Sequence, residues 1–318
     1  MAEKSLNVVV VGAGLMDITI RCSQIPQAGQ TVKGGGLSYC PTGSGVNQAI
    51  QAALCGCNVN FISKVGSDPF GKMIKENLES FGVITDFVYT AEAMNTGTAV
   101  TLVNSNGENA ICASPGANRS LRSEDIKKAE GLFESAAVCL IHGQMPQDTI
   151  ITAIRTAQVH GTKVIIDPAR STQQWNHAET DLPIEYFSAN VLIPDLSEAE
   201  QITAEPAESI HTAKLLGSEI VGRGVENVII KLDKRGCMLV SKDGSVRIPP
   251  FDVELVDQTC SGDAFAGALA AYCAVGDDMT EAVKFASAAG ALACTKFGSQ
   301  DSLPSKAEII ELLQTQGD

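Results

Sequence analysis

The stretch whose residues are best suited to catalysis runs from Asp257 to Asp263, with the sequence Asp-Gln-Thr-Cys-Ser-Gly-Asp. An Ala-rich apolar run follows it to Val275 and stops at Gly276, a pattern that predicts a helix and its C-terminal end. Small residues at such a turn leave backbone N–H groups uncovered at the helix N-terminus, where an anion can bind. Asp263 lies in the first helical turn, so its carboxylate either caps the helix or accepts a proton from a hydroxyl group that attacks a phosphate.

Apolar runs of strand length alternate with helical stretches over most of the chain. Residues 7–11 form an apolar run that ends at Gly12, which predicts a buried parallel strand. Further strands are expected at 138–141, 164–166, 191–193 and 228–230, with helices around 147–160, 197–203 and 208–222. This order predicts an α/β fold in which helices cover both faces of a mostly parallel sheet, with ligands at the carboxyl ends of the strands. The polar residues at these ends are Asp17, Gln144, Asp167, Asp195 and Lys231.

Two segments depart from the strand–helix order. Residues 15–39 are strand-like and rich in glycine, and residues 98–103 meet Asn106-Gly107 before a second strand-like run at 109–112. Asn-Gly between two such runs indicates a β-hairpin. We interpret both segments as a small separate sheet, which is either a flap over a site or an edge decoration. Another strand is expected at 251–256, where residues alternate in the manner of a strand.

Two glycine-rich segments resemble nucleotide-binding motifs but lack a required residue. Gly12-Ala13-Gly14 begins like a dinucleotide fingerprint, but Asp17 replaces the third glycine and a strand-like run follows it. A nicotinamide-dependent oxidoreductase is therefore a rival hypothesis of lower rank. Residues 66–72 have the spacing of a P-loop, but Met73 stands where a Ser or Thr must reach Mg²⁺. We reject the P-loop and expect Pro69 to begin a helix.

The composition predicts a compact soluble protein, and no linker is long enough to divide the core, so residues 1–318 are expected to form one domain. The 318 residues are 44% hydrophobic and 19% charged, with a formal charge of −14. This charge has the wrong sign for nucleic acid or an anionic membrane as a general partner. No apolar segment approaches membrane-spanning length, and the run at 8–11 is too short for a signal peptide. The ten cysteines lie mostly singly in apolar runs, which predicts reduced thiols and a cytoplasmic protein.

Four segments, in this order and spacing, resemble the ribokinase branch of the PfkB family of sugar kinases. They are Asp17 after the first strand, the range 42–49, the range 96–118 and the range 257–263. The resemblance implies a ribokinase-like α/β fold: a central, mostly parallel sheet flanked by helices, with a small β-sheet lid formed by about residues 15–39 and 96–115. It also implies ATP- and Mg²⁺-dependent phosphorylation of a ribose-like sugar hydroxyl. Because exposed lid sheets commonly pair, we also expect a homodimer through residues 15–39 and 98–115.

The resemblance also assigns roles to individual residues. Asp263 would be the general base, and the anion site would be formed by the amides of Cys260, Ser261, Gly262 and Asp263. The sugar would be bound by Asp17, Gly43, Ser44, Asn47, Gln144 and Asp263. ATP would be bound by Asp195, Lys231, Leu232, Asp233, Lys234, Arg235, Gly236, Gly262 and Ser287. Glu198 would hold Mg²⁺ through water, and a monovalent cation such as K⁺ would be held by Asp257, Thr259, Ala293, Lys296, Gly298 and Ser302.

Some of these residues also have ordinary structural interpretations. Asn47 and Asp195 are of types that favour helix N-termini, and Asp17 and the glycines are typical of turns. His142, at the end of a predicted strand, is expected to be a hydrogen-bonded structural histidine. A degenerate relative that senses a sugar or nucleotide without turnover is therefore an alternative to the kinase.

The sequence departs from the usual ribokinase pattern at three polar positions of the sugar site. Ribokinases usually carry Lys where this chain has Ser44, Asn where it has Leu15, and Glu where it has Gln144. A site built to hydrogen-bond a hydroxyl group discriminates sharply among substrates, so such changes alter sugar recognition. The sugar is therefore left open between ribose, a related furanose, a polyol and a nucleoside. Asp195 likewise replaces the Asn of the usual Asn-x-x-Glu pattern, which keeps an oxygen atom and adds charge.

Overall fold

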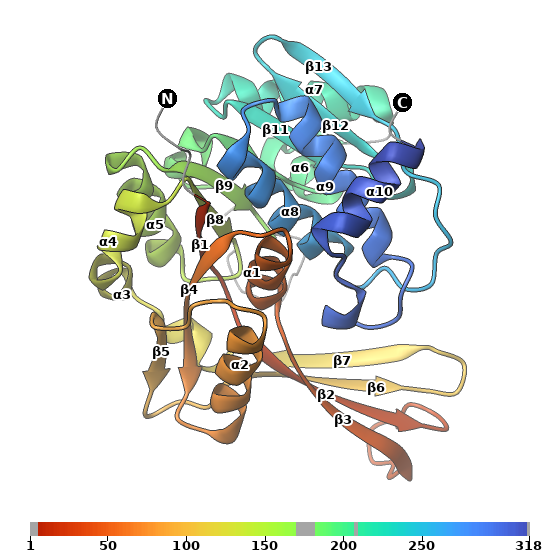
Figure 1. Cartoon of the computed structure of the whole chain (residues 1–318). Helices are drawn as coiled ribbons and strands as arrows, with labels where there is room; N and C mark the ends of the chain where they lie inside the picture. Colours follow the sequence, from red (N-terminus) through yellow and green to blue (C-terminus); the bar gives the residue numbers. More distant parts are fainter. Residues whose placement is uncertain (1–5, 170–181, 207–208, 317–318) are drawn as a thin grey trace.

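The computed structural model of the chain describes residues 6–169, 182–206 and 209–316. Within these residues, a nine-stranded sheet with the order β13-β12-β11-β10-β9-β8-β1-β4-β5 forms the centre of the molecule. In this spatial order, the seven strands from β11 across to β5 pair in parallel, whereas β12 and β13 form an antiparallel edge. Helices cover both faces of the sheet (Figure 1). The predicted α/β fold with a mostly parallel sheet is confirmed.

The central strands are apolar because both of their faces are buried. Val8 and Val10 join one hydrophobic core, whereas Val9 and Val11 join the other, since successive side chains of a strand point to opposite faces. The strands of this sheet are β1 (Asn7–Val11), β4 (Asn58–Gly66), β5 (Val88–Ala91), β8 (Val138–His142), β9 (Lys163–Asp167), β10 (Val191–Leu192), β11 (Asn227–Lys231), β12 (Cys237–Ser241) and β13 (Gly244–Ile248).

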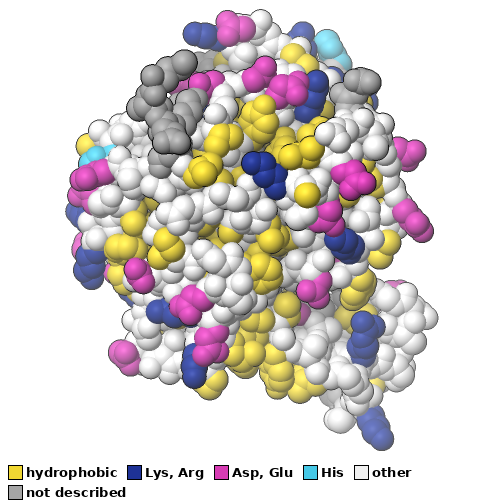
Figure 2. Space-filling model, viewed as in Figure 1, with side chains coloured by type: hydrophobic (Ala, Val, Ile, Leu, Met, Phe, Trp, Pro, Cys, Tyr) yellow, Lys and Arg dark blue, Asp and Glu magenta, His cyan; other side chains and the backbone are white. Residues whose placement is uncertain are grey.

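Two groups of helices bury the two faces. The first core receives side chains from α1 (Ser44–Leu54), α2 (Pro69–Ser80), α8 (Ser261–Val275), α9 (Met279–Ala293) and α10 (Lys306–Gln316). The second receives them from α3 (Ser123–Lys128), α4 (Glu130–Ser135), α5 (Gln147–Val159), α6 (Leu196–Thr203) and α7 (Ile210–Gly222). In the part of the chain that the structure describes, none of the helices has the length and apolar character to cross a membrane. Acidic and basic side chains are scattered over the face shown in Figure 2.

A second, four-stranded sheet projects from one end of the molecule (Figure 1). Its order is β3-β2-β6-β7, and its strands are β2 (Leu15–Cys22), β3 (Gly34–Thr42), β6 (Gly97–Val103) and β7 (Asn109–Ser114). The predicted hairpin is present, and Gly107 in its loop has the positive φ of 83° that favours glycine. We call these four strands the lid sheet. The separate small sheet that the sequence predicted is therefore confirmed.

The strand predicted at residues 251–256 is wrong. Pro249 and Pro250 follow β13 directly, and proline lacks the N–H group that a continuing strand ladder needs. The segment instead runs along helices: the Asp252 amide donates to Gln316 Oε1 of α10 at 2.9 Å, and the Val256 amide donates to the Cys294 carbonyl at 2.8 Å. The segment that precedes the Asp257–Asp263 turn is thus held by α10 and the end of α9 rather than by a sheet.

Helix α1 makes unusually close backbone contacts on two sides. A Cβ atom on Gly45 would lie 2.7 Å from backbone atoms of Gly12 and Ala13, at the end of β1. A Cβ atom on Gly267 of α8 would lie 2.5 Å from the carbonyl oxygen of Gln48. No side chain fits at such distances without a shift of the backbone. Glycine at these positions therefore places α1 directly against the N-terminal half of α8.

The first prediction concerns this helix contact. We expect Gly267→Ala to destabilise the protein by about 1–3 kcal/mol, because the new methyl group forces α1 and α8 apart. Gly131→Ala in α4 is the matched control: no atom lies within 4 Å of the place that its methyl group would take, and alanine favours helix by about 0.5–1 kcal/mol. Urea denaturation of both variants measures the difference. Equal stability of the two variants would contradict the packing argument.

Candidate active site

The N-terminal turn of α8 presents free backbone amides. The helix begins at Ser261, and its N-cap residue Cys260 has a left-handed backbone (φ 64°) and forms no side-chain cap. The Ser261 amide donates to the Gln258 carbonyl at 3.3 Å. Among the described residues, no hydrogen-bond acceptor is found for the amides of Cys260, Gly262 and Asp263. Three of the four amides predicted to bind an anion are therefore available, whereas the Ser261 amide is already bonded.

The carboxylate of Asp263 is held by two amide side chains of α1. Asn47 Nδ2 donates to Asp263 Oδ2 at 2.9 Å, and Gln48 Nε2 lies 3.4 Å from Asp263 Oδ1. Asn47 Nδ2 also lies 3.0 Å from the sulfur of Cys260. The interpretation of Asn47 as a helix N-cap is wrong, because α1 begins at Ser44 with Gly43 as its N-cap. Asp263 likewise forms no cap, so its carboxylate is oriented across the helix interface.

The surroundings of Asp263 shift its proton affinity. Burial raises the pKa of Asp263, and the negative charge of Asp167 raises it further, while hydrogen bonds from Asn47 and Ser44 and the proximity of His142 act in the opposite direction. The net effect is a pKa above the ordinary value. Burial also lowers the pKa of His142, which favours its neutral form. His142 was predicted to be a hydrogen-bonded histidine. Its Nδ1 is buried without a hydrogen-bond partner among the described residues, so the prediction is wrong for this nitrogen.

The residues predicted to bind sugar lie where the lid sheet meets the body. Asp17 of β2 accepts hydrogen bonds from the hydroxyl groups of Thr19 at 2.5 Å and Thr101 at 2.7 Å. Gly43 has a positive φ of 109°, and a Cβ there would lie 2.8 Å from the Ala13 carbonyl oxygen, so both the backbone and the close contact favour glycine. Ser44 is the first residue of α1, and Gln144 follows β8 and is partly exposed.

Sequence reasoning missed several residues of this site. Thr19 was detectable, because it lies two residues after Asp17 and so faces the same side of the strand. Thr101 depends on the pairing of β2 with β6, and Gln48 depends on the contact of α1 with α8. Neither contact between distant segments has a local sequence signal.

The residues predicted to bind ATP gather at the ends of β11 and β10. Asp195 is the N-cap of α6 and forms a capping box with Glu198, with both hydrogen bonds at 2.7 Å, so its helix-start interpretation is confirmed. Lys231 forms an ion pair with Asp167, with Nζ and Oδ1 3.4 Å apart. Glu198 is buried, and this burial raises its pKa to about 7, although the charge of Lys231 opposes the shift. Several carboxylates therefore surround one ammonium group.

The turn Leu232–Gly236 connects β11 to β12 beside α9. Leu232 is buried, whereas residues 233–235 form an exposed 3₁₀ turn. Gly236 has a φ of 83°, and a Cβ there would lie 2.1 Å from the carbonyl oxygen of Ile248. Ser287 of α9 contacts Cys237, with 3.4 Å between the hydroxyl oxygen and the sulfur. The structure thus brings this turn and Ser287 to one place.

The two segments predicted to hold a monovalent cation are joined by Asp257. Its Oδ1 accepts from the amide and hydroxyl of Thr259 at 2.9 and 2.7 Å, and its Oδ2 accepts from the Gly298 amide at 3.1 Å. Ala293 and Ser302, which lie before and after Gly298 in the sequence, are fully buried. The side chain of Lys296 pairs with Glu308 at 2.9 Å. No group of three or more metal-ligating side chains is found in the described ranges.

The comparison with known families identifies the class of protein. The sequence matches the pfkB family of carbohydrate kinases over residues 5–306, so the chain belongs to this family. It is 32% identical to ribokinase of Mus musculus over 312 residues, which cover 96% of this chain and 94% of the relative. It is 31% identical to ribokinase of Bacillus subtilis (96% and 99% covered) and 29% identical to deoxyribokinase of Salmonella typhi (97% and 99% covered).

Solved structures show the same fold. Arabidopsis thaliana ribokinase, in a complex with ribose and ATP, superposes with a TM-score of 0.89 at 26% identity, with 98% of this chain and 99% of the other covered. Thermotoga maritima ribokinase gives a TM-score of 0.85 at 28% identity, with 96% and 99% covered. The chain is therefore a carbohydrate kinase of the ribokinase-like type.

The second prediction concerns the ionisation of Asp263. Its carboxyl group should titrate above the ordinary value of about 4. Asn47→Ala should raise the titration midpoint further, because it removes a hydrogen bond that stabilises the charged form of Asp263. Carbon-13 NMR of the carboxyl group as a function of pH measures both. Asn104→Ala in the β6–β7 loop serves as a control without effect. A lower midpoint in the Asn47 variant would refute the assigned contact.

Proposed function

We propose that the protein transfers the γ-phosphoryl group of ATP to a hydroxyl group of a ribose-like sugar, with Asp263 as general base. One observation carries the proposal: the Asp263 carboxylate stands at the N-terminus of α8, next to amides that bond to no described residue. A helix N-terminus with free amides favours phosphate. The ribokinase and deoxyribokinase relatives, and the Arabidopsis ribokinase complexed with ribose and ATP, support a sugar and ATP as substrates.

The proposed reaction has one proton acceptor and one anion site. The sugar oxygen forms a bond to the γ-phosphorus as the bond to the leaving ADP oxygen breaks, and the hydroxyl proton passes to Asp263. A positioned base contributes about 10²–10⁴-fold to the rate. The amides of Cys260, Gly262 and Asp263 stabilise the charge on the phosphoryl oxygens, each such donor being worth around 10²–10³-fold. The raised pKa of Asp263 makes it a better proton acceptor than an ordinary carboxylate.

The sugar is proposed to lie between the lid sheet and α1. Asp17 is the first contact, since Thr19 and Thr101 fix both of its oxygens. Asn47 is the second, because its Oδ1 is buried without a described partner and can accept a hydrogen bond from a hydroxyl group. Gly43, Ser44 and Gln144 complete the proposed site. The departures at Leu15, Ser44 and Gln144 leave ribose, 2-deoxyribose and other furanoses or nucleosides as candidates.

The nucleotide is proposed to extend from the α8 N-terminus along the ends of β10 and β11. Asp195, Lys231, the turn Leu232–Gly236, Gly262 and Ser287 are its proposed contacts. Mg²⁺ usually binds one or two carboxylates, water and substrate phosphates, which fits the carboxylate-rich surroundings of Glu198 better than a closed protein cage. When bound, Mg²⁺ would neutralise phosphate charge. A monovalent cation is proposed beside the hydrogen bonds of Asp257, at the residues that the sequence indicated.

The third prediction tests the function. A coupled assay should detect ADP formation that depends on one sugar from a panel of pentoses, 2-deoxyribose, hexoses, polyols and nucleosides. Asp263→Asn should lower kcat by about 10²–10⁴-fold while ATP affinity changes by no more than about threefold, because only the proton acceptor is lost. Asp243→Asn, in the exposed β12–β13 turn, is the control.

Other outcomes favour the rival functions. A thermal shift with a sugar or nucleotide but no ADP release would favour the sensor. NADH binding without ATP binding would favour the oxidoreductase.

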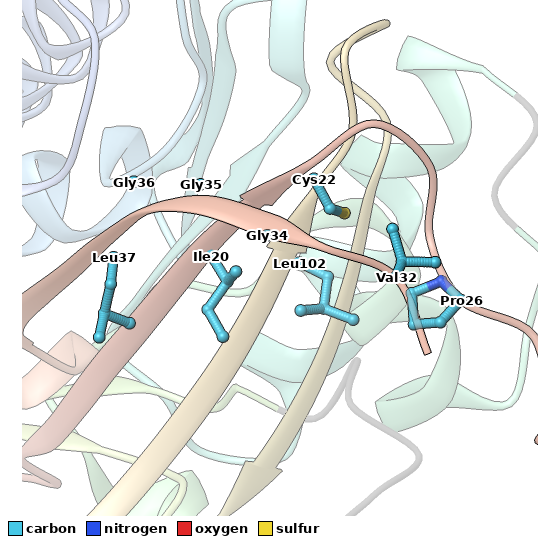
Figure 3. Close-up of a pocket in the computed structure, with 9 residues that line it drawn as sticks. All are labelled: Ile20, Cys22, Pro26, Val32, Gly34, Gly35, Gly36, Leu37 and Leu102. Carbon is cyan, nitrogen blue, oxygen red and sulfur yellow. The ribbon is translucent and has the colours of Figure 1, made fainter. Parts of the chain in front are cut away.

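We also propose a homodimer formed through the lid sheet. Leu37, Tyr39 and Val100 expose apolar side chains on it. Ile20, Leu37 and Leu102 lie beside one another there, and together with Val32 and Pro26 they line an open pocket (Figure 3). Pairing with a second copy would remove this apolar surface from water.

A cytoplasmic location is proposed as well, since all ten cysteines are free thiols. Recovery of the protein from the secreted fraction of cells would contradict this proposal.

The fourth prediction tests the dimer. Leu37→Glu should convert a dimer to monomers in sedimentation velocity, because it introduces a charge into the proposed apolar contact. Val159→Glu, at an exposed apolar residue of α5 on the body of the molecule, should leave the dimer intact. A monomeric parent protein, or a dimer that survives Leu37→Glu, would exclude the lid as the interface.

A further inference from the structure

Asp167 connects two groups of the proposed site. It is the last residue of β9, and 6% of its surface is exposed. Gln48 Nε2 donates to its Oδ2 at 2.9 Å, and Lys231 Nζ lies 3.4 Å from its Oδ1. The two oxygens of this carboxylate thus bind different partners, one an amide of α1 and the other the ammonium group at the end of β11.

The amide partner leads to the proposed base. The same Gln48 Nε2 lies 3.4 Å from Asp263 Oδ1, so Gln48 bridges the two carboxylates. Gln48 is fully buried, and the close α1–α8 contact at Gly267 fixes its backbone. A change at Asp167 can therefore reach Asp263 through one buried side chain.

The ammonium partner leads to the anion site. Lys231 Nζ would lie 3.9 Å from a Cβ atom on Gly262, so it stands beside the N-terminal turn of α8. Burial opposes its charge, but Asp167, Glu198 and Asp195 outweigh this and raise the pKa of Lys231, so it stays protonated. An ammonium group at this place is within reach of a phosphoryl group bound by the free amides.

We propose that Asp167 is a positioning residue that fixes both the cation and the base of phosphoryl transfer. Its Oδ1 holds the Lys231 ammonium beside the anion site, where Lys231 contacts the transferred phosphoryl group. Its Oδ2 holds Gln48 against Asp263. The inference rests on the function proposed above and deepens it. Phosphoryl transfer depends mainly on positioning and electrostatics, so a group that aligns cation and base acts on kcat.

The test compares single and combined variants by steady-state kinetics with ATP and the preferred sugar. Lys231→Gln should lower kcat/KM for ATP by about 10²–10³-fold, as expected for a lost charge-stabilising donor. Asp167→Asn keeps the shape and removes the charge, so kcat should fall by about 10–10²-fold while KM for ATP changes by no more than about threefold. In a protein that already carries Lys231→Gln and Gln48→Met, Asp167→Asn should cost less than about threefold, because both of its partners are gone.

A matched control lies at the other end of the same strand. Lys163 of β9 pairs with Asp277 at 3.6 Å, so Asp277→Asn breaks a lysine–aspartate pair far from the site and should leave kcat unchanged. Melting temperatures show which variants fold, and Gln48→Met replaces Asp167→Asn as the test of the base arm if the latter unfolds. A kcat of Gln48→Met equal to that of the parent would then overturn the base arm.

The outcomes separate this inference from the proposed function. An active parent protein whose Asp167→Asn variant keeps its kcat within about twofold overturns the inference alone. A full additive loss in the combined variant also overturns it, because Asp167 would then act independently of Lys231 and Gln48. A parent protein without sugar-dependent ADP formation overturns the proposed function together with the inference.

Discussion

The close approach of α1 to α8 is the constraint on which the site depends. Glycine at 45 lets α1 touch the end of β1, and glycine at 267 lets it touch α8, so the helix packs directly against both. Asn47 and Gln48 then reach the carboxylate of Asp263 across the interface. Without this contact, Asp263 would be an ordinary acidic residue in a first helical turn. Packing at two glycines therefore gives the helix start an oriented carboxylate beside free amides.

The electrostatics of the site balance burial against a small number of opposite charges. Asp167, Glu198 and Asp195 lie around one lysine, and burial biases His142 toward its neutral form. This excess of negative charge would repel ATP, so the free amides, Lys231 and a divalent cation must offset it locally. The formal charge of −14 on the whole chain makes the same point on a larger scale. In the proposed site, an anion is therefore bound through local geometry and not through the overall field of the protein.

The sequence predicted elements whose signals are local. The strand–helix alternation, the Asn-Gly hairpin and the α8 helix ending at Gly276 all matched the structure. The strand predicted at 251–256 is wrong although its residues alternate in the manner of a strand. The segment follows two prolines and packs on helices instead of pairing with another strand. By residue type alone, Asn47 fits a helix cap as well as a residue of the site. Only the observed start of α1 decides between these two interpretations. Asp167 was among the polar residues expected at the strand ends, because the end of a strand is a local signal. Gln48 and Thr101 gained their places from contacts between distant segments, and such contacts leave no mark on neighbouring residues.

The central claim is that Asp263 receives the proton of a sugar hydroxyl group whose oxygen attacks a phosphate bound at the α8 N-terminus. A crystal structure with the preferred sugar and an unreactive ATP analogue tests it most directly. The account predicts that one sugar hydroxyl lies within hydrogen-bond distance of Asp263 and that the amides of Gly262 and Asp263 face the γ-phosphate. A γ-phosphate bound elsewhere, or an Asp263 carboxylate that still contacts only Asn47 and Gln48, would contradict it.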